Sequence, residues 1–170
     1  MNVRRLGIDD VSEFWALRLR GFRDEPSAFG SSYEEAMTRT LAAVTRDFPV
    51  ADEDNFVLGA FTPAGLVGIV GLRREERRKR RHRADLWGMH VAREARGQGV
   101  GRALVDELIR RVRAISAPEP IEQILLTVTA HNEPARALYR RAGFVVYGVA
   151  PRALRLDGES YDEELMRLDL

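Results

Sequence analysis

The stretch Val91-Ala-Arg-Glu-Ala-Arg-Gly-Gln-Gly-Val-Gly-Arg-Ala-Leu104 decides the fold. The apolar segment 84–91 in front of it predicts a strand, and Leu104, Leu108 and Val112 behind it recur at helical spacing. The glycines therefore indicate a tight turn from a strand into a helix. The first amides of such a helix have no intrahelical partner and lie at the positive end of its dipole, which favours a bound phosphate.

Other known phosphate loops fit this stretch less well. The glycines at 97, 99 and 101 follow a Gly-x-Gly-x-Gly spacing without the Gly-Lys-Ser/Thr ending of a Walker loop. A Rossmann loop follows the first strand of its unit, whereas this one comes after about four predicted strands. Arg96 and Arg102 offer charge-assisted bonds to a phosphate at the same place. A plain turn whose glycines serve packing remains the alternative.

The hydrophobic pattern predicts strands and helices on both sides of this turn. Strands are expected at 1–6, 55–62, 66–72, 84–91, 121–129, 144–149 and 161–168, with helices opening at Asp10, at Ser31–Ser32 (running to about Asp47), after Gly101 and at Asn132. Pro118 and Pro120 are expected to end the third helix, and Gly143 to cap the fourth. This order predicts one α/β (α+β) domain over residues 1–170, with a single mixed, mostly antiparallel sheet flanked by helices.

Composition narrows the class of protein. The 170 residues carry a formal net charge of +1 and no cysteine, which excludes disulfides, thiolate metal sites and a cysteine nucleophile. The longest purely apolar or glycine run, 66–72, is far too short to span a membrane, and the N-terminus lacks a signal peptide. His82, His90 and His131 have no metal-ligand spacing, so no metal is expected. We therefore expect a soluble, cytoplasmic protein without a membrane partner.

A basic run stands out between two predicted strands. Residues 73–83 contain eight Arg or Lys and two Glu, a net charge of +6, which leaves −5 for the rest of the chain. Such a run attracts anions, including coenzyme phosphates or nucleic acid. It is also typical of a solvated hairpin loop, and without interleaved aromatic residues nucleic acid is the less favoured partner.

Two motifs together resemble the GCN5-related N-acetyltransferase (GNAT) family. Arg96-x-x-Gly99-x-Gly101 resembles the Arg/Gln-x-x-Gly-x-Gly/Ala signature with which that family binds acetyl-CoA. Downstream, Asn132, the run Ala137-Leu-Tyr139 and the pair Gly143-Phe144 resemble the family's Asn…Ala-Leu-Tyr-x-x-x-Gly-Phe pattern. The predicted order of elements is also similar to the family's fold.

The resemblance implies a site for acetyl-CoA as cosubstrate. The pyrophosphate would lie on the amides of the turn, and the pantetheine arm would pair with the preceding strand as an extra strand does. The implied binding residues are Met89, His90, Val91, Arg96, Gly97, Gln98, Gly99, Val100, Gly101, Arg102 and Asn132. A backbone amide of the strand would polarise the thioester carbonyl.

The resemblance also implies direct transfer of the acetyl group to a primary amine of a small molecule or peptide, without a covalent acyl-enzyme. Tyr139 would protonate the departing thiolate as general acid, with a core aromatic as its alternative role. Asp85 is a candidate base, expected on the same strand face as Trp87, Met89 and Val91. Glu34 and Glu35 are other candidates, although helix capping also accounts for them. His90 and His131 flank the predicted groove and are alternative proton relays.

Two other functions remain open at this point. The chain is alternatively a non-catalytic acetyl-CoA-binding or sensing module, or a nucleic-acid-associated protein that uses the loop 73–83. The acceptor pocket is expected between the first two helices and the hairpin from Val146 to Tyr161. The sequence leaves the acceptor, the base and the oligomeric state open, a homodimer included.

Overall fold

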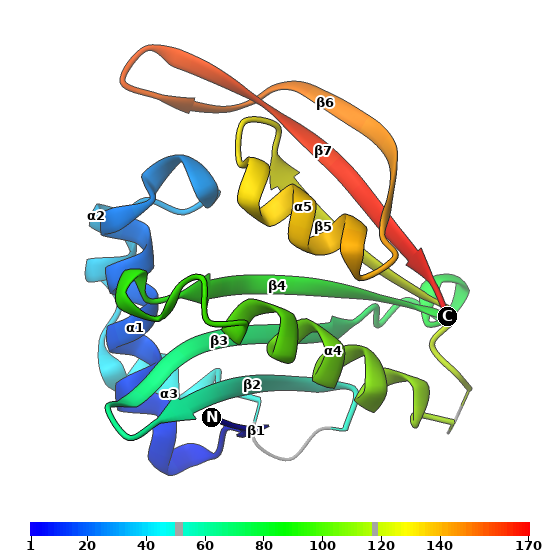
Figure 1. The fold of residues 1–170 in the computed structure, drawn as a ribbon, viewed down its shortest axis with the longest axis horizontal. Coiled ribbons are helices and arrows are strands. Elements are labelled where there is room, and N and C mark those ends of the chain that lie inside the picture. Colours follow the sequence, from blue (N-terminus) through cyan, green and yellow to red (C-terminus); the bar gives the residue numbers. More distant parts are fainter. Residues whose placement is uncertain (50–52, 117–118) are drawn as a thin grey trace.

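The computed structural model describes residues 1–49, 53–116 and 119–170, and its centre is a seven-stranded sheet of order β1-β2-β3-β4-β5-β7-β6 (Figure 1). The strands are β1 (Asn2–Arg5), β2 (Asn55–Thr62), β3 (Gly65–Arg74), β4 (Arg83–Val91), β5 (Gln123–Thr129), β6 (Val145–Leu156) and β7 (Glu159–Asp169). The α-helices are α1 (Val11–Asp24), α2 (Tyr33–Met37), α3 (Leu41–Arg46), α4 (Val100–Arg113) and α5 (Glu133–Arg141). Among the described residues, no helix combines the length and hydropathy that a membrane span needs.

The mixed sheet expected from the sequence is confirmed. β4 and β5 run parallel, and the other described neighbours pair antiparallel. Helix α4 covers one face of β2, β3 and β4, because a Cβ placed on Gly68 would meet Val100 and Leu104 of that helix. Helix α1 covers the opposite face, where its Gly21 lies against the ring of His90. Burial of apolar side chains between these layers is the main stabilising term for such a fold.

The helical segment between β1 and β2 differs from the expectation. One helix was predicted from Ser31–Ser32 to about Asp47, whereas the chain forms the two short helices α2 and α3. Ser32 and Glu35 form the expected capping box of α2. The prediction was wrong further on because Thr40 caps a new helix start, its hydroxyl accepting a hydrogen bond from the N–H of Ala43 at 3.2 Å. Asp10, expected to cap α1, instead accepts from the N–H of Gly7 at 2.8 Å.

A β-bulge interrupts β4 at Gly88. The register passes from Ile69↔His90 to Gly71↔Trp87, so β4 has one more residue than β3 there. Gly88 has a φ of +66°, a left-handed conformation that favours glycine. Since the bulge reverses the alternation of side chains, the prediction that Asp85 and Trp87 share a face with Met89 and Val91 was wrong. Met89 and Val91 face α4, whereas Trp87 lies over Gly71 on the side of α1.

The loop within the basic run 73–83 is shorter than expected. β3 extends to Arg74 and β4 starts at Arg83, so only residues 75–82 connect them. Arg74 is buried and donates to the carbonyl oxygens of Arg81 (2.6 Å) and Glu119 (2.7 Å) and to the carboxylate of Asp54 (3.0 Å). Part of the charge thus stabilises the sheet end. Pro118, expected to end the helix now labelled α4, lies outside the described residues.

Candidate active site

The two parallel strands at the centre of the sheet separate along their length. β4 pairs with β5 only from Arg83 to Asp85, although β4 continues to Val91 beside β3 and β5 continues to Thr129 beside β7. Figure 1 shows the two strands diverging, with α1 and α2 at the wide end of the split and α5 along β5. Among the described residues, no strand pairs with these edges inside the split, which leaves room for an extended ligand to pair there.

The backbone of β4 offers hydrogen-bonding groups to this split. The N–H of Ala92 donates to the carbonyl oxygen of Val67 on β3 at 2.9 Å. Because inward and outward groups alternate along an antiparallel pair, the backbone of His90 also faces β3, and that of Met89 and Val91 faces the split. Two of the three strand residues predicted to bind a pantetheine arm therefore point their backbone groups in the required direction.

The glycine turn presents unbonded amides. Gly97 and Gly99 have φ values of +73° and +80°, and Gly99 is the N-cap of α4. The first hydrogen bond of the helix is the one from the N–H of Ala103 to the carbonyl oxygen of Gly99, at 3.0 Å. Within the described part of the chain, the N–H groups from 97 to 102 make no hydrogen bond. A Cβ on Gly97 or Gly99 would meet no atom within 4 Å, so a ligand can approach these amides.

The arginines of the turn have protein partners. Arg96 pairs with Glu25 at 3.0 Å and donates to the carbonyl oxygen of Val91 at 3.1 Å. Arg102 pairs with Asp106 at 2.6 Å and donates to the carbonyl oxygen of Arg141 at 2.9 Å. The donors toward a phosphate at this turn are therefore the backbone amides, with the two exposed guanidinium groups beside them.

Helix α5 carries Asn132 and Tyr139 on the other side of the split. Asn132 caps the helix, its Oδ1 accepting from the N–H of Ala135 at 3.2 Å, which leaves its Nδ2 as a donor. Tyr139 is buried, with its ring 5.8 Å from that of Phe144. Burial raises the pKa of the Tyr139 phenol above its ordinary value, so the phenol stays protonated at neutral pH. A protonated phenol is a possible proton donor.

Asp85 lies at the narrow end of the split, where the last β4–β5 pair forms. Its carboxylate is 3.6 Å from the guanidinium of Arg73, and its side chain is one-third exposed (33%). Burial raises the pKa of Asp85 above its ordinary value, against a smaller opposing effect of Arg73. The alternation along β4 places Asp85 on the face of Trp87. The basicity of this carboxylate is therefore greater than that of an ordinary aspartate.

His90 is buried between β4 and α1. Its ring contacts the position where a Cβ of Gly21 would lie, at 3.1 Å, and lies 6.2 Å from the ring of Phe29. Burial, with a further effect of Arg96 and Arg18, lowers the pKa of His90 to about 4. His90 is therefore neutral at pH 7. His131, the other candidate relay, hydrogen-bonds with the hydroxyl of Ser27 at 3.1 Å.

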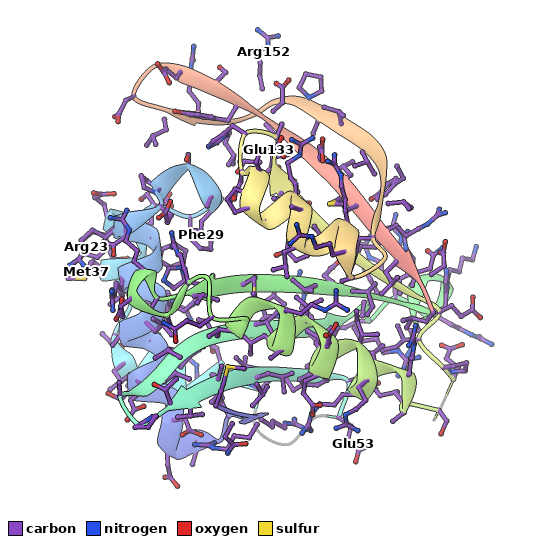
Figure 2. All side chains as sticks on the ribbon, viewed as in Figure 1. Arg23, Phe29, Met37, Glu53, Glu133 and Arg152 are labelled. Atoms are coloured by element: carbon purple, nitrogen blue, oxygen red, sulfur yellow. The ribbon has the colours of Figure 1, made fainter. Side chains whose placement is uncertain are left out.

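Two cavities open on the α1 side of the sheet. One, of about 590 Å³, lies between α1, α2, α3 and the β3–β4 pair, with Phe14, Arg18 and Trp87 in its wall. The other, of about 700 Å³, lies between residues 22–35 and the β6–β7 hairpin, the region for which the sequence predicts an acceptor pocket. Figure 2 labels Phe29, which comes from the segment between α1 and α2, and Glu133, at the start of α5, on opposite sides of the wide end of the split.

The first cavity contains residues that the sequence did not single out. Trp87 was named only for the strand face that it was predicted to share with Asp85, and Arg18 was not named. The one signal for Arg18 in the sequence is its place as a charged residue between the apolar residues Leu17 and Leu19. Among the described residues, no group of three or more His, Asp or Glu is arranged to hold a metal ion.

The split, the unbonded amides and the cavity beside α1 have the geometry that an extended ligand with a phosphate end requires. The model of the acetyltransferase (GNAT) family matches residues 18–144. The chain belongs to the GNAT family.

Three related proteins illustrate the likeness. The putative phosphinothricin acetyltransferase YwnH of Bacillus subtilis is 28% identical over 82 residues, which cover 48% of either chain. A GNAT acetyltransferase of Streptococcus pneumoniae superposes with a TM-score of 0.80 at 22% identity, covering 99% of this chain and 98% of that one. The putative acetyltransferase yncA of Salmonella typhimurium, solved with acetyl-CoA, has a TM-score of 0.81 at 18% identity, covering 99% of this chain and 93% of that one. The alignment thus spans about half the length of the curated relative.

Proposed function

We propose that this chain is an acetyl-CoA-dependent N-acetyltransferase acting on a primary amine of a small molecule or peptide. One observation carries the proposal: the split between β4 and β5 leads directly to a row of unbonded amides at 97–102. That geometry suits a ligand with an extended amide-bearing arm and a diphosphate, as coenzyme A has. Membership in the GNAT family and the small-molecule name of the Bacillus relative support the same activity.

The residues present fit the coenzyme. The amides of Gly97, Gln98, Gly99, Val100, Gly101 and Arg102 would hold the pyrophosphate, with Arg96 beside them. Met89 and Val91 would pair with the pantetheine arm, while His90 supports the strand from the core. The free Nδ2 of Asn132 would donate to a pantetheine carbonyl. Bound acetyl-CoA supplies an activated acetyl thioester.

The chain's own groups account for the protons. Asp85, with its raised pKa, accepts a proton from the ammonium form of the acceptor and passes it to solvent, because only a neutral amine is nucleophilic. A nitrogen–carbon bond then forms and the carbon–sulfur bond breaks. The leaving thiolate takes its proton from the Tyr139 hydroxyl, and the proton lost by the new amide nitrogen restores the phenol. One proton is released in total for each ammonium acetylated.

A thiol-release screen tests this proposal. Purified protein is mixed with acetyl-CoA and a panel of amines, amino acids, aminoglycosides and peptides, and free thiol is measured over time. We expect release that depends on at least one amine, together with its acetylated product by mass spectrometry. Saturable acetyl-CoA binding without release from any amine would instead support a non-catalytic binding module.

A further inference from the structure

Arg18 occupies an unusual place for a cation. Its guanidinium carbon lies over three aromatic rings, 4.6 Å from the centroid of Phe22, 5.4 Å from Phe29 and 5.6 Å from Trp87. Its Nη1 is inaccessible to water and makes no hydrogen bond with any residue in 1–49, 53–116 or 119–170. Burial alone lowers the pKa of Arg18, to about 10, so the side chain is charged at neutral pH.

A buried charge without a counter-ion is costly, so proteins usually pair such groups. The buried Arg74 follows that rule, since it pairs with Asp54 at 3.0 Å, whereas the partly buried Arg18 forms no ion pair with a described residue. The aromatic faces give Arg18 a favourable cation–π environment, yet they leave Nη1 without an acceptor. Nη1 faces the bulge of β4, so the guanidinium nitrogens left for an anion are Nε and Nη2.

The space beside Arg18 suits a small ligand. Arg18 lines the cavity of about 590 Å³, together with the apolar side chains of Phe14, Phe22 and Trp87. Of the carboxylates in the wall, Asp47 pairs with Arg39 at 2.7 Å, and Glu35 accepts from the N–H of Ser32 at 2.9 Å. The third, Glu76, is exposed at the surface. Arg18 is therefore the charge that an entering anion meets at the aromatic end of this cavity.

Arg18 also lies close to the proposed reaction centre. A Cβ placed on Gly88, the bulge residue of β4, would be 2.8 Å from Nη1 of Arg18. The next residue, Met89, directs its backbone groups into the split that would hold the thioester. In an acceptor whose anionic group binds Arg18, an amine only a few bonds from that anionic group can therefore reach the acetyl group.

We propose that Arg18 binds the carboxylate of the acceptor. The acceptor is then an amino acid, or another compound whose amine and carboxylate are as close together as in an amino acid. This inference rests on the proposed N-acetyltransferase activity. Nε and Nη2, the guanidinium nitrogens that are not shut off from water, donate paired hydrogen bonds to the two carboxylate oxygens, and the rings of Phe22, Phe29 and Trp87 hold the guanidinium in place. The amine is then directed toward Met89 and the acetyl thioester.

The test compares acceptors that differ in one charge. For each of several amino acids, kcat/KM is measured with the free acid and with its carboxamide at saturating acetyl-CoA. We expect the unchanged protein to prefer the acid on the order of 10- to 100-fold, the usual effect of a charged hydrogen bond. The amine of the carboxamide is less basic, so easier deprotonation cannot produce that preference.

Two variants assign the preference to its residue. Arg18→Gln is expected to bring the acid-to-carboxamide ratio close to one. Calorimetry should show acetyl-CoA affinity within about twofold of the unchanged protein, because Arg18 is not among the groups proposed to hold the coenzyme. Arg39→Gln is the matched control, because Arg39 lines the same cavity but already pairs with Asp47. It is expected to keep the ratio.

Three results would overturn the inference. Equal use of acid and carboxamide by the unchanged protein would show that no carboxylate is recognised, and this comparison needs no variant. An equal loss of both activities in Arg18→Gln would assign Arg18 to support of the aromatic cluster. Either result leaves N-acetyltransfer itself in place. Absence of thiol release from every amine, charged or neutral, would overturn the proposed activity and this inference with it.

Discussion

At the scale of single residues, the proposed chemistry depends on the Tyr139 phenol keeping its proton until the thiolate leaves. The side chain is buried beside Phe144, and burial raises its pKa. The same burial that makes Tyr139 a core residue therefore also keeps its phenol in the protonated form that a proton donor needs. The two roles expected from the sequence are compatible, and only a measurement of turnover separates them.

Replacing Tyr139 with Phe tests the acid role. We expect kcat to fall by about 10²- to 10⁴-fold, the usual contribution of a positioned acid. The coenzyme affinity measured by calorimetry should stay within about twofold, since a hydroxyl remote from the phosphates is lost. Tyr147→Phe, which removes a hydroxyl from an exposed residue of β6, is the control and should change neither value. An unchanged kcat in Tyr139→Phe would exclude the acid role.

His90 makes stability depend on pH. Its folded pKa of about 4 lies below the ordinary value of 6.5, so between these values the unfolded chain binds more protons. The folded state therefore loses stability as pH falls from 7 to 5, by about 2 kcal/mol through this group. Denaturant unfolding at both pH values measures the loss. His90→Gln should show a smaller loss than the unchanged protein, and an identical pH dependence would refute the assignment.

At the scale of elements, the turn into α4 combines a left-handed backbone at its glycines with an open approach for a ligand. Gly99 has a φ of +80°, and no atom lies within 4 Å of a Cβ built on it. Gly158, in the β6–β7 turn, has a φ of +84° and equally open surroundings. Both positions therefore require a left-handed backbone, but a ligand is proposed to lie only over Gly99.

Valine at each of these glycines separates strain from binding. Gly99→Val and Gly158→Val should each lose about 1–3 kcal/mol of unfolding free energy, because a branched side chain disfavours the left-handed region. Only Gly99→Val should lose acetyl-CoA binding in calorimetry, since its side chain would occupy the approach to the amides. Retained binding in Gly99→Val would mean that the turn does not hold the coenzyme.

The N-cap of α5 allows a similar separation. Asn132→Asp keeps an oxygen that accepts from the N–H of Ala135 but removes the Nδ2 donor. Melting temperature should therefore stay close to that of the unchanged protein, since Asp and Asn cap helices about equally well. The dissociation constant for acetyl-CoA should rise about 2- to 10-fold, the effect of one lost hydrogen bond. Unchanged affinity would remove Asn132 from the binding site.

At the scale of the whole molecule, much of the fold was predictable because its signals are local. The strand-to-helix turn, the cap at Asn132 and the left-handed Gly143 each depend on a few neighbouring residues, and the structure has all three. The parallel pair followed from a strand, a helix and another strand in succession. These local signals also carried the family resemblance that the comparison with known proteins confirmed.

The features that the sequence did not predict depend on contacts between distant segments. The bulge at Gly88 arises from packing of Trp87 over Gly71 and of Arg18 against β4, and no alternation within β4 announces it. The cavity beside α1 needs the break between α2 and α3, which Thr40 causes. Arg18 shows its significance only in the folded structure, where no carboxylate of the described residues pairs with it.

Residue-resolved amide hydrogen exchange, with and without acetyl-CoA, tests the central claim most directly. The unbonded N–H groups at 97–102 should exchange fast in the free protein and slow at least tenfold with saturating acetyl-CoA, together with Met89 and Val91, because each would then donate to the ligand. Exchange of the β6–β7 turn should stay the same. Unchanged rates at 97–102 in protein saturated with acetyl-CoA would contradict the account.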